Sequence, residues 1–513
     1  MADQTRLRRC SNKPRVFIIS DISNEPDDAE SLVRLLLYSN ELSIQGLVAC
    51  TSCHMKSTVH PEDMHTIISA YACVVSNLKA HVHPENQYPS ASYLHSIVKA
   101  GPAVYGKLAI QPGFELSEGA RLLIDRVDAC DDDTCNDDEK LWILCWGGTN
   151  VLAQALQHIH STRSPASSSH FCSKLRVYAI SDQDDPSHWI RLTFPDIFYI
   201  CSIHAWKEYA MAAWTGISGE LFAPLDDGAP DSSMITREWL RENIQIGPYG
   251  SVYPDYTFIM EGDTPSFLYL IQNGLGSRED PHWGSWGGRY ALVDLGGSSR
   301  HFADVRDVVV GVGGKRAFSS QATVWRWREA FQSDFAARMQ WTLSAERGKA
   351  NHAPVVVVND STPGPEHLYL EAEAGDVVRL DARRSYDPDG DELTFRWFQY
   401  KEPTKTQSEL HWQVVPDIEF KIVGDGTEGP HGAVVEVQVP PAEICAIDIL
   451  TGTALEKGQV LHLILEVTDS GVPSMRTYKR VVLQVTNKLG KGASGKVYET
   501  VTQAIEKKTD VNV

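Results

Sequence analysis

Short runs of apolar residues alternate with stretches of helical periodicity from residue 15 to about residue 340. The apolar runs lie at 15–20, 44–51, 141–146 and 174–181, and the helical stretches at 29–39, 62–77, 117–127 and 149–158. Strands that are apolar throughout are buried on both faces, which is typical of parallel sheets. Their alternation with helices predicts an α/β fold in which helices flank a mainly parallel sheet.

The first apolar run ends in an acidic loop. Asp21 follows the run directly, and Asp27 and Asp28 come six and seven residues later. Ligands of open α/β sheets bind at the carboxyl ends of strands, where loops converge. Carboxylates packed together repel one another unless a cation or hydrogen-bond donors neutralise them, and oxygen ligands suit Ca²⁺ or Mg²⁺. The loop therefore predicts a site for a divalent cation.

A second interpretation of this loop needs no metal. In it, Asn24 caps the following helix, Pro26 occupies the first turn, and the acidic side chains complement the helix dipole. This accounts for Asp27 or Asp28 but not for Asp21 as well.

The chain of 513 residues is too long for a single core, and its pattern of apolar and polar residues changes near residue 350. A polar stretch, 344–353, leads into short β-rich runs separated by turn residues, which predict an antiparallel sandwich. A tail rich in Gly and Lys follows. We expect an α/β domain at 14–343, an Ig-like β-sandwich at 354–487 and a tail at 488–513.

Charge and composition narrow the partners. Lys and Arg total 47 against 67 Asp and Glu, a formal net charge of −20, which disfavours duplex nucleic acid. We see no apolar segment of membrane-spanning length and no signal core at the start of the chain. Cysteines in apolar runs are typical of a reducing compartment. We expect a soluble cytoplasmic protein with no membrane partner, and the oligomeric state stays open, a homo-oligomer included.

The segment Cys50-Thr51-Ser52-Cys53-His54 has the spacing of a haem-attachment motif and of a redox dithiol. The apolar run before it favours another interpretation, in which a second buried strand leads into a loop of the site. A third strand ends similarly. Residues 141–146 run into Gly147-Gly148-Thr149-Asn150, where the glycines let the backbone approach a ligand and the Thr149 carbonyl offers a further oxygen to a metal.

The acidic loop and the Gly-Gly-Thr-Asn turn together resemble the nucleoside hydrolase superfamily, whose first strand ends in an Asp-rich loop closing with Asp-Asp. The sequence is most similar to its cellulose-binding-protein-like branch, in which Asn-Glu-Pro-Asp-Asp, Trp-Gly-Gly-Thr-Asn and Trp-Gly-Ser-Trp-Gly-Gly-Arg precede an Ig-like domain. This resemblance covers residues 14 to 487. It implies metal-dependent hydrolysis of N-glycosidic or related glycosyl bonds through an oxocarbenium-like transition state. The alternative is a carbohydrate-binding protein without turnover, and the expected ligand is a small glycoside or an oligosaccharide.

The resemblance also implies roles for single residues. Asp27 and Asp28 match the Asp-Asp pair, which ligates Ca²⁺ and helps to hold the vicinal hydroxyls of a sugar. Asp21 has a possible general-base role, which makes Asp21 and Asp28 the catalytic candidates. The expected metal ligands are Asp21, Asp27, Asp28 and the Thr149 carbonyl. The expected substrate-binding residues are Asn24, Glu25, Asn150, Asp182, Glu261, Trp283 and Trp286.

The sequence departs from the family pattern in two places. Ser23 stands where the family has another carboxylate, four residues before the Asp-Asp pair, and the family's late His-Asp pair has no clear counterpart. Glu261 and Asp263 are the nearest acidic candidates for the missing ligand. Trp283 and Trp286 either stack on a sugar face or pack a lid.

One acidic turn lies in the β-rich region. Asp387-Pro388-Asp389-Gly390-Asp391 has the composition of a surface Ca²⁺ site, and it is also simply a strong turn sequence. The residues alone favour the plain turn, and the Ca²⁺ site is the alternative.

Overall fold

The structure is a computed structural model that describes residues 3–10, 12–130, 139–221, 225–294, 296–406, 415–424, 430–493, 497–500 and 502–503. The chain divides into two compact units. Unit 1 comprises Met1–Gln272 and Gly276–Asn351, and unit 2 comprises Asn273–Leu275 and His352–Val513. Most of the predicted tail beyond residue 493 lies outside the described residues.

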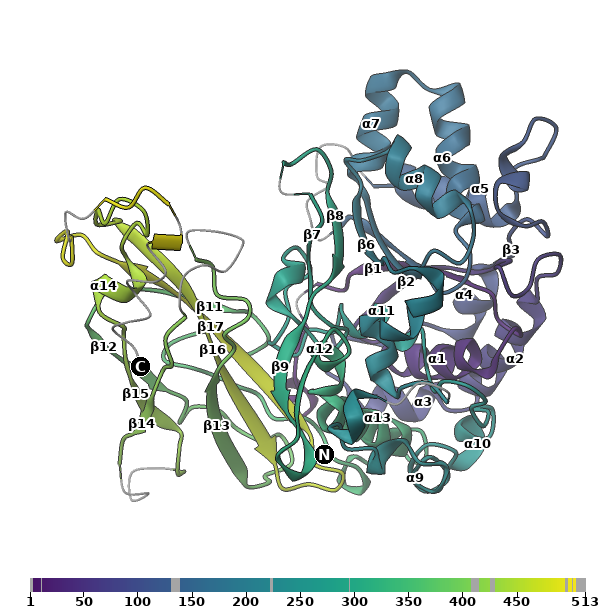
Figure 1. Ribbon diagram of the computed structural model, residues 1–513. Coiled ribbons are helices and arrows are strands. Elements are labelled where there is room, and N and C mark those ends of the chain that lie inside the picture. The colour runs from purple at the N-terminus through teal and green to yellow at the C-terminus, as the bar shows by residue number, and fades with distance from the viewer. Residues whose placement is uncertain are drawn as a thin grey trace. The chain divides into compact units, whose positions relative to one another are not determined.

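Unit 1 is built on an eight-stranded sheet with the order β3-β2-β1-β4-β5-β6-β8-β7 (Figure 1). Its strands are β1 (Arg15–Ser20), β2 (Ser43–Ala49), β3 (Val98–Ala100), β4 (Leu141–Cys145), β5 (Leu175–Ser181), β6 (Phe198–Ser202), β7 (Tyr290–Leu292) and β8 (His301–Asp304). All neighbours pair in parallel except β7, which is antiparallel to β8 at one edge. The predicted α/β fold with a mainly parallel sheet is confirmed.

The helices of unit 1 are α1 (Pro26–Leu37), α2 (Pro61–Ala72), α3 (Val75–Leu78), α4 (Ala91–Ser96), α5 (Glu118–Asp128), α6 (Asn150–Thr162), α7 (Pro165–Ser173), α8 (Pro186–Thr193), α9 (Arg237–Asn243), α10 (Gly247–Gly250), α11 (Thr264–Leu268), α12 (Ala322–Trp325) and α13 (Arg328–Trp341). A two-stranded sheet, β9 (Asp307–Val310) with β10 (Arg316–Ser319), precedes α12. Among the described residues, no helix has the length and apolar character needed to cross a membrane.

Two helices differ from the sequence-based expectation. Helix α1 begins at Pro26 rather than at residue 29, because proline is well suited to a first helical position. Glu25, not Asn24, is its N-cap residue, and no side chain caps the helix there. A further helix that we did not predict, α7, lies within the segment 161–173. Its N-cap Ser164 accepts a hydrogen bond from the Ser167 N–H.

Apolar side chains cover both faces of the sheet. On one face, Phe17, Ile143 and Val177 pack with residues of α5, α6 and α8 in one continuous core. On the other face, the ring of Tyr269 lies 5.5 Å from that of Trp142. Burial on both faces makes the sheet a rigid base for the loops at its strand ends.

The strand order reverses between β1 and β4. From β1 the chain continues outward to β2 and β3, whereas β5 and β6 extend the sheet on the side of β4. The loops after β1 and β4 therefore leave in opposite directions, which opens a crevice at their carboxyl ends. Both predicted site loops begin at this point.

Unit 2 has two sheets with a common core. The strands are β11 (Leu368–Glu373), β12 (Val377–Asp381), β13 (Leu393–Gln399), β14 (Phe420–Ile422), β15 (Val434–Gln438), β16 (Lys457–Asp469) and β17 (Arg476–Thr486), with one short helix, α14 (Ala442–Cys445). One sheet has the order β11-β17-β16-β13 and the other β12-β15-β14. Their apolar residues form one cluster, as in a β-sandwich.

Two details of unit 2 differ from the prediction. Strand β11 runs parallel to β17, although the other pairs are antiparallel. The apolar run 355–358 forms no strand, and within it Val355 makes a single bridge to Tyr386.

Candidate metal-binding site

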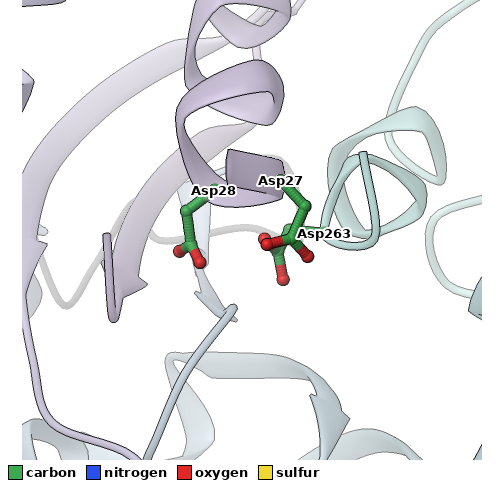
Figure 2. Close-up of side chains that lie close together, drawn as sticks. All are labelled: Asp27, Asp28 and Asp263. Atoms are coloured by element: carbon green, nitrogen blue, oxygen red, sulfur yellow. The ribbon is translucent and has the colours of Figure 1, made fainter. Parts of the chain in front are cut away.

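Three carboxylates from distant parts of the chain meet near the carboxyl end of β1. Asp27 and Asp28 belong to the first turn of α1, and Asp263 directly precedes α11. One oxygen of each lies within 4.8 Å of the others. Figure 2 shows the three carboxylates gathered between these elements. The spacing suits oxygens that share one Ca²⁺, whose bonds to oxygen are about 2.3–2.6 Å long.

Strand β1 positions the first part of this site. The hydroxyl of Ser20, the last residue of the strand, donates to Asp28 Oδ1 over 2.5 Å and accepts from the backbone N–H of Ile22 over 3.1 Å. Asp21 comes next, and its carbonyl accepts from the Asn24 N–H at 3.0 Å. This turn leads the chain from β1 into α1. Asp21 and Asp28 are both buried.

A buried ion pair fixes the loop that carries Asp263. Arg34 Nη1 on α1 lies 2.5 Å from Oε2 of Glu261, and the Tyr253 hydroxyl donates to Oε1 of the same carboxylate at 2.9 Å. Glu261 has φ +55°, a left-handed conformation that residues other than glycine rarely adopt. We expected Glu261 to bind substrate, but the structure commits its carboxylate to Arg34 and Tyr253, away from solvent.

Strand β4 anchors Asp263 from the other side. The Ser266 hydroxyl donates to the backbone carbonyl of Asp263 at 2.7 Å. The indole N–H of Trp146, the residue after β4, donates to that hydroxyl at 2.8 Å. Asp263 is thus connected to the same edge of the sheet as Asp21, although the two are far apart in the sequence.

Three glycines leave room for carboxylates. A Cβ built on Gly147 would lie 2.6 Å from Asp21 Oδ1, and one on Gly262 would lie 2.7 Å from Asp27 Oδ2. A Cβ on Gly148 would lie 2.6 Å from Asp184 Oδ2. These distances are shorter than ordinary van der Waals contact, so a larger residue would displace the carboxylates. We expected Gly147 and Gly148 to let the backbone approach a ligand; in the structure both glycines lie close to acidic side chains.

The clustered acids have raised pKa values. Burial is the main cause for each, and the neighbouring carboxylates add to it in Asp27, Asp28 and Asp263. The pKa rises to about 8 for Asp27 and well above its usual range for Asp28 and Asp263. For Asp21, burial outweighs a Ser52 hydrogen bond and raises the pKa to about 6. The site binds protons because its negative charges are not compensated.

Part of the site has unsatisfied hydrogen-bonding capacity. Oδ2 of Asp21 and Oδ2 of Asp263 are buried and have no hydrogen-bond partner within the described ranges. Among the described residues, no Lys or Arg forms an ion pair with Asp21, Asp27, Asp28 or Asp263. An unpaired buried charge is costly, and a divalent cation with oxygen preference would remove that cost. The donor set therefore fits Ca²⁺.

The Thr149–Asn150 turn lies beside the cluster and has its own contacts. The Thr149 carbonyl accepts the Ala153 N–H at 2.9 Å in the first turn of α6, and its hydroxyl donates to Asp184 Oδ1 at 2.9 Å. Asn150 is the first residue of α6 rather than the cap, and its Nδ2 donates to Thr51 Oγ1 at 2.9 Å. Asn150 Oδ1 is buried without a partner. The turn thus braces the loop after β2.

Of the acids after β5, Asp184 rather than Asp182 faces the glycine turn. Asp182 pairs with Arg191 through both carboxylate oxygens, which leaves little capacity for the expected contact with substrate. Asp184 is buried against Gly148, and burial raises its pKa to about 7 despite hydrogen bonds from Thr149 and Ser187. Spacing alone did not distinguish the two acids.

The two tryptophans expected to stack on a sugar lie inside unit 1. Trp286 is fully buried, with its ring edge-on to Phe331 at 6.4 Å, and Trp283 is 6 % exposed. Another aromatic residue lies at the site instead. The Trp214 ring would come within 3.3 Å of a Cβ on Gly262, and its indole N–H donates to Ser181 Oγ at 3.2 Å. No motif in the sequence marks Trp214.

Asn24 and Glu25 line a pocket of about 550 Å³ beside the acidic cluster. Asp63 and Thr66 of α2 form part of its wall. Ser23, also in the lining, has φ +81°, and its hydroxyl donates to the Asp63 carboxylate. The Asp63 carboxylate thus lies next to position 23, where the family pattern has a carboxylate.

The fold and the acidic site define a nucleoside hydrolase-like protein. Residues 15–290 match the family model described as "Cellulose-binding Sde182, nucleoside hydrolase-like domain", and residues 377–485 match "Cellulose-binding protein Sde0182, C-terminal domain". The chain belongs to this cellulose-binding, nucleoside hydrolase-like family. The resemblance inferred from the sequence is confirmed.

A solved structure supports the assignment. It is described as a nucleoside hydrolase-related hypothetical protein from Saccharophagus degradans that is associated with carbohydrate metabolism, and it is 30% identical with a TM-score of 0.70. The alignment covers 92% of this chain and 100% of that one. A second structure, the effector protein XOO4466, aligns at 10% identity over 66% of this chain and 94% of that one, with a TM-score of 0.27. No curated protein matches the chain.

Proposed function

We propose that unit 1 is a Ca²⁺-dependent hydrolase of N-glycosidic, nucleoside-like bonds or of related glycosyl bonds. The observation that carries this proposal is the cluster of Asp27, Asp28 and Asp263, whose carboxylates converge without a basic partner among the described residues. Their position at the reversal of strand order, where ligands of α/β proteins bind, supports it.

The three carboxylates are the ligands that would hold the ion. A bound Ca²⁺ neutralises them and offers its remaining coordination positions to water and to the vicinal hydroxyls of a sugar. Three protein ligands leave such positions free, since Ca²⁺ takes about six to eight oxygens. Thr149 is a less direct candidate, because its carbonyl already accepts a helix hydrogen bond.

Asp21 is the general base in this proposal. Its Oδ2 is buried, has no hydrogen-bond partner and lies close enough to raise the pKa of Asp263. A carboxylate with these properties accepts a proton from the attacking water. Ser52 and His54 favour its ionised form.

A second candidate function is carbohydrate binding without turnover. Ser23 stands in place of a family carboxylate. The acid that accepts its hydrogen bond, Asp63, lines the pocket with it, and both residues are at least partly exposed. The matched family models are named as cellulose-binding. Under this alternative, the same cation would orient sugar hydroxyls and no bond would be cleaved.

Calcium binding and hydrolysis by the Asp28→Asn/Asp263→Asn double variant test the proposal. We expect calorimetry to show at least about a hundredfold loss of Ca²⁺ affinity at this site and loss of hydrolysis across a panel of nucleosides and aryl glycosides. Asp128→Asn, which changes an exposed acid on α5, is the matched control and should behave as wild type.

The outcomes separate the two functions. Unchanged Ca²⁺ binding and unchanged hydrolysis in the double variant would refute the metal site. Heat on titration with cello-oligosaccharides, combined with no turnover of any panel compound by the calcium-loaded wild type, would refute the hydrolase and support the binding protein.

A further inference from the structure

A second acidic cluster lies in unit 2, in the turn between β12 and β13. Asp387, Asp389 and Asp391 occupy alternate positions, and one oxygen of each lies within 4.8 Å of the others. Alternate placement is how the first three ligands of an EF-hand loop are arranged, at positions 1, 3 and 5. The intervening Gly390 has φ +93°, which permits the sharp bend that brings the outer two acids together.

The hydrogen bonds of Asp387 use only one of its two carboxylate oxygens. Its Oδ1 accepts three backbone hydrogen bonds, from the N–H groups of Asp389 at 2.7 Å, Gly390 at 2.9 Å and Asp391 at 3.1 Å. The residue is only 5% exposed, and its Oδ2 is buried with no hydrogen-bond partner in the part of the chain that the structure describes. A turn needs only the first oxygen. The second, buried and unpaired beside two more carboxylates, is what a cation would satisfy.

Contacts from neighbouring residues hold the turn in place. Asp389 accepts the backbone N–H of His352 at 2.9 Å and lies 2.8 Å from its Nδ1. Tyr386 and Val355 exchange both backbone hydrogen bonds, at 2.9 and 3.0 Å. In the described part of unit 2, no Lys or Arg pairs with Asp387 or Asp391.

We propose that Asp387, Asp389 and Asp391 form a second Ca²⁺ site, separate from the one in unit 1, that stabilises unit 2. Hard carboxylate oxygens favour Ca²⁺ or Mg²⁺ over softer metals. Ca²⁺ is favoured of the two because it accepts irregular sets of carboxylates, whereas Mg²⁺ demands near-octahedral geometry and retains its waters. Under this proposal, the turn is a Ca²⁺ site, the first of the two interpretations that the sequence offered.

The test is a calcium titration of the full chain carrying Asp28→Asn and Asp263→Asn, which removes the site of unit 1. We expect about one Ca²⁺ per chain by calorimetry, with a Kd of about 1 mM or tighter, and an increase in Tm of about 4 °C at saturation. Adding Asp387→Asn and Asp389→Asn should abolish both effects. The amide that Asp387→Asn introduces keeps an Oδ1 acceptor for the three N–H groups, so the turn itself is preserved.

Asp448→Asn is the matched control. Asp448 forms a similar turn, in which its Oδ1 accepts the N–H groups of Leu450 and Thr451, but it belongs to neither acidic cluster. It should leave calcium binding unchanged. The proposal is overturned if the chain with only the unit 2 site shows no calcium heat up to several times that Kd, or if the Asp387→Asn/Asp389→Asn changes leave the titration unaltered. Titrating the wild type in parallel reports on the unit 1 site independently.

Discussion

Unit 1 contains two groups of buried acids that are treated in opposite ways. In the first, Glu41 and Asp334 lie among basic partners. Arg8 Nη2 lies 2.6 Å from Glu41, Arg338 Nε lies 2.7 Å from Asp334, and the Tyr38 hydroxyl donates to Asp334 at 2.6 Å. In the second group, at the end of β1, the described residues supply no such cation.

The pKa values report this difference. Burial raises the pKa of Asp334, but Arg338 and Arg8 outweigh it, and the net pKa is lowered. Burial and mutual repulsion act together on Asp28 and Asp263, and their pKa values are well above the usual range. The same domain thus neutralises buried acids where they serve the fold and leaves them unneutralised at the strand ends. This contrast supports the proposal that the second group binds a cation.

The largest effect of a substitution is expected from breaking the neutralised group. Arg338→Met leaves Glu41 and Asp334 buried without their shared partner and removes the guanidinium that lies 4.1 Å from the centre of the Tyr38 ring. We expect a loss of about 3–5 kcal/mol in the free energy of unfolding, measured by urea denaturation. A loss below about 1 kcal/mol would mean that the charges of Glu41 and Asp334 are no better compensated than those of the acids at the end of β1.

A pH titration should sharpen the comparison. The folded-state pKa values of Asp21 and Asp27 are raised to about 6 and about 8. Protonation of these two carboxylates therefore stabilises the folded state. This stabilisation is complete below the unfolded pKa near 4, and it is lost as the pH rises through the folded pKa values. Without calcium, stability should fall by about 7 kcal/mol between pH 4 and 8 if both acids titrate at these values, since one pKa unit corresponds to about 1.4 kcal/mol.

Thermal melts across that pH range, with EDTA and with excess CaCl₂, make this measurement. Calcium should restore Tm most strongly at the alkaline end, because there the carboxylates are ionised. A flat profile in EDTA would contradict the uncompensated state of the site.

The smallest effect is expected from Asp27→Asn. Without calcium, the change removes one of the repelling charges, and unfolding free energy should rise by about 1 kcal/mol at pH 8. With calcium, the variant should lose the part of the metal-dependent increase in Tm that comes from the site of unit 1. Asp63→Asn, a nearby acid outside the cluster, serves as control. If Asp27→Asn destabilises the metal-free chain, the carboxylates are not in conflict.

The sequence predicted the sheet and half of the site. Buried strands are recognisable because parallel sheets require continuous apolar runs, and the four predicted runs appear as β1, β2, β4 and β5. The position of Asp21, Asp27 and Asp28 at a strand end followed from the same pattern. In unit 2, β11 was missed because its exposure alternates, and β14 was missed because it has only three residues.

The rest of the site depends on tertiary contacts. Asp263 lies near Asp27 in a loop where Glu261 pairs with Arg34 and has a left-handed conformation, and no local pattern signals a pair separated by more than two hundred residues. Trp286 was expected at a ligand surface because aromatic residues in glycine-rich loops suit both stacking and packing. Its burial against Phe331 is decided by helix α13, far along the chain.

The tight fit around Gly262 has a consequence for recognising proteins that share this arrangement. Its missing side chain leaves the space that Asp27 occupies, with 2.7 Å between a Cβ at that position and the carboxylate oxygen. A relative with alanine or anything bulkier there must turn its aspartate elsewhere, even if every acid is retained. Glycine at position 262 is therefore a better indicator of this arrangement than the acids themselves.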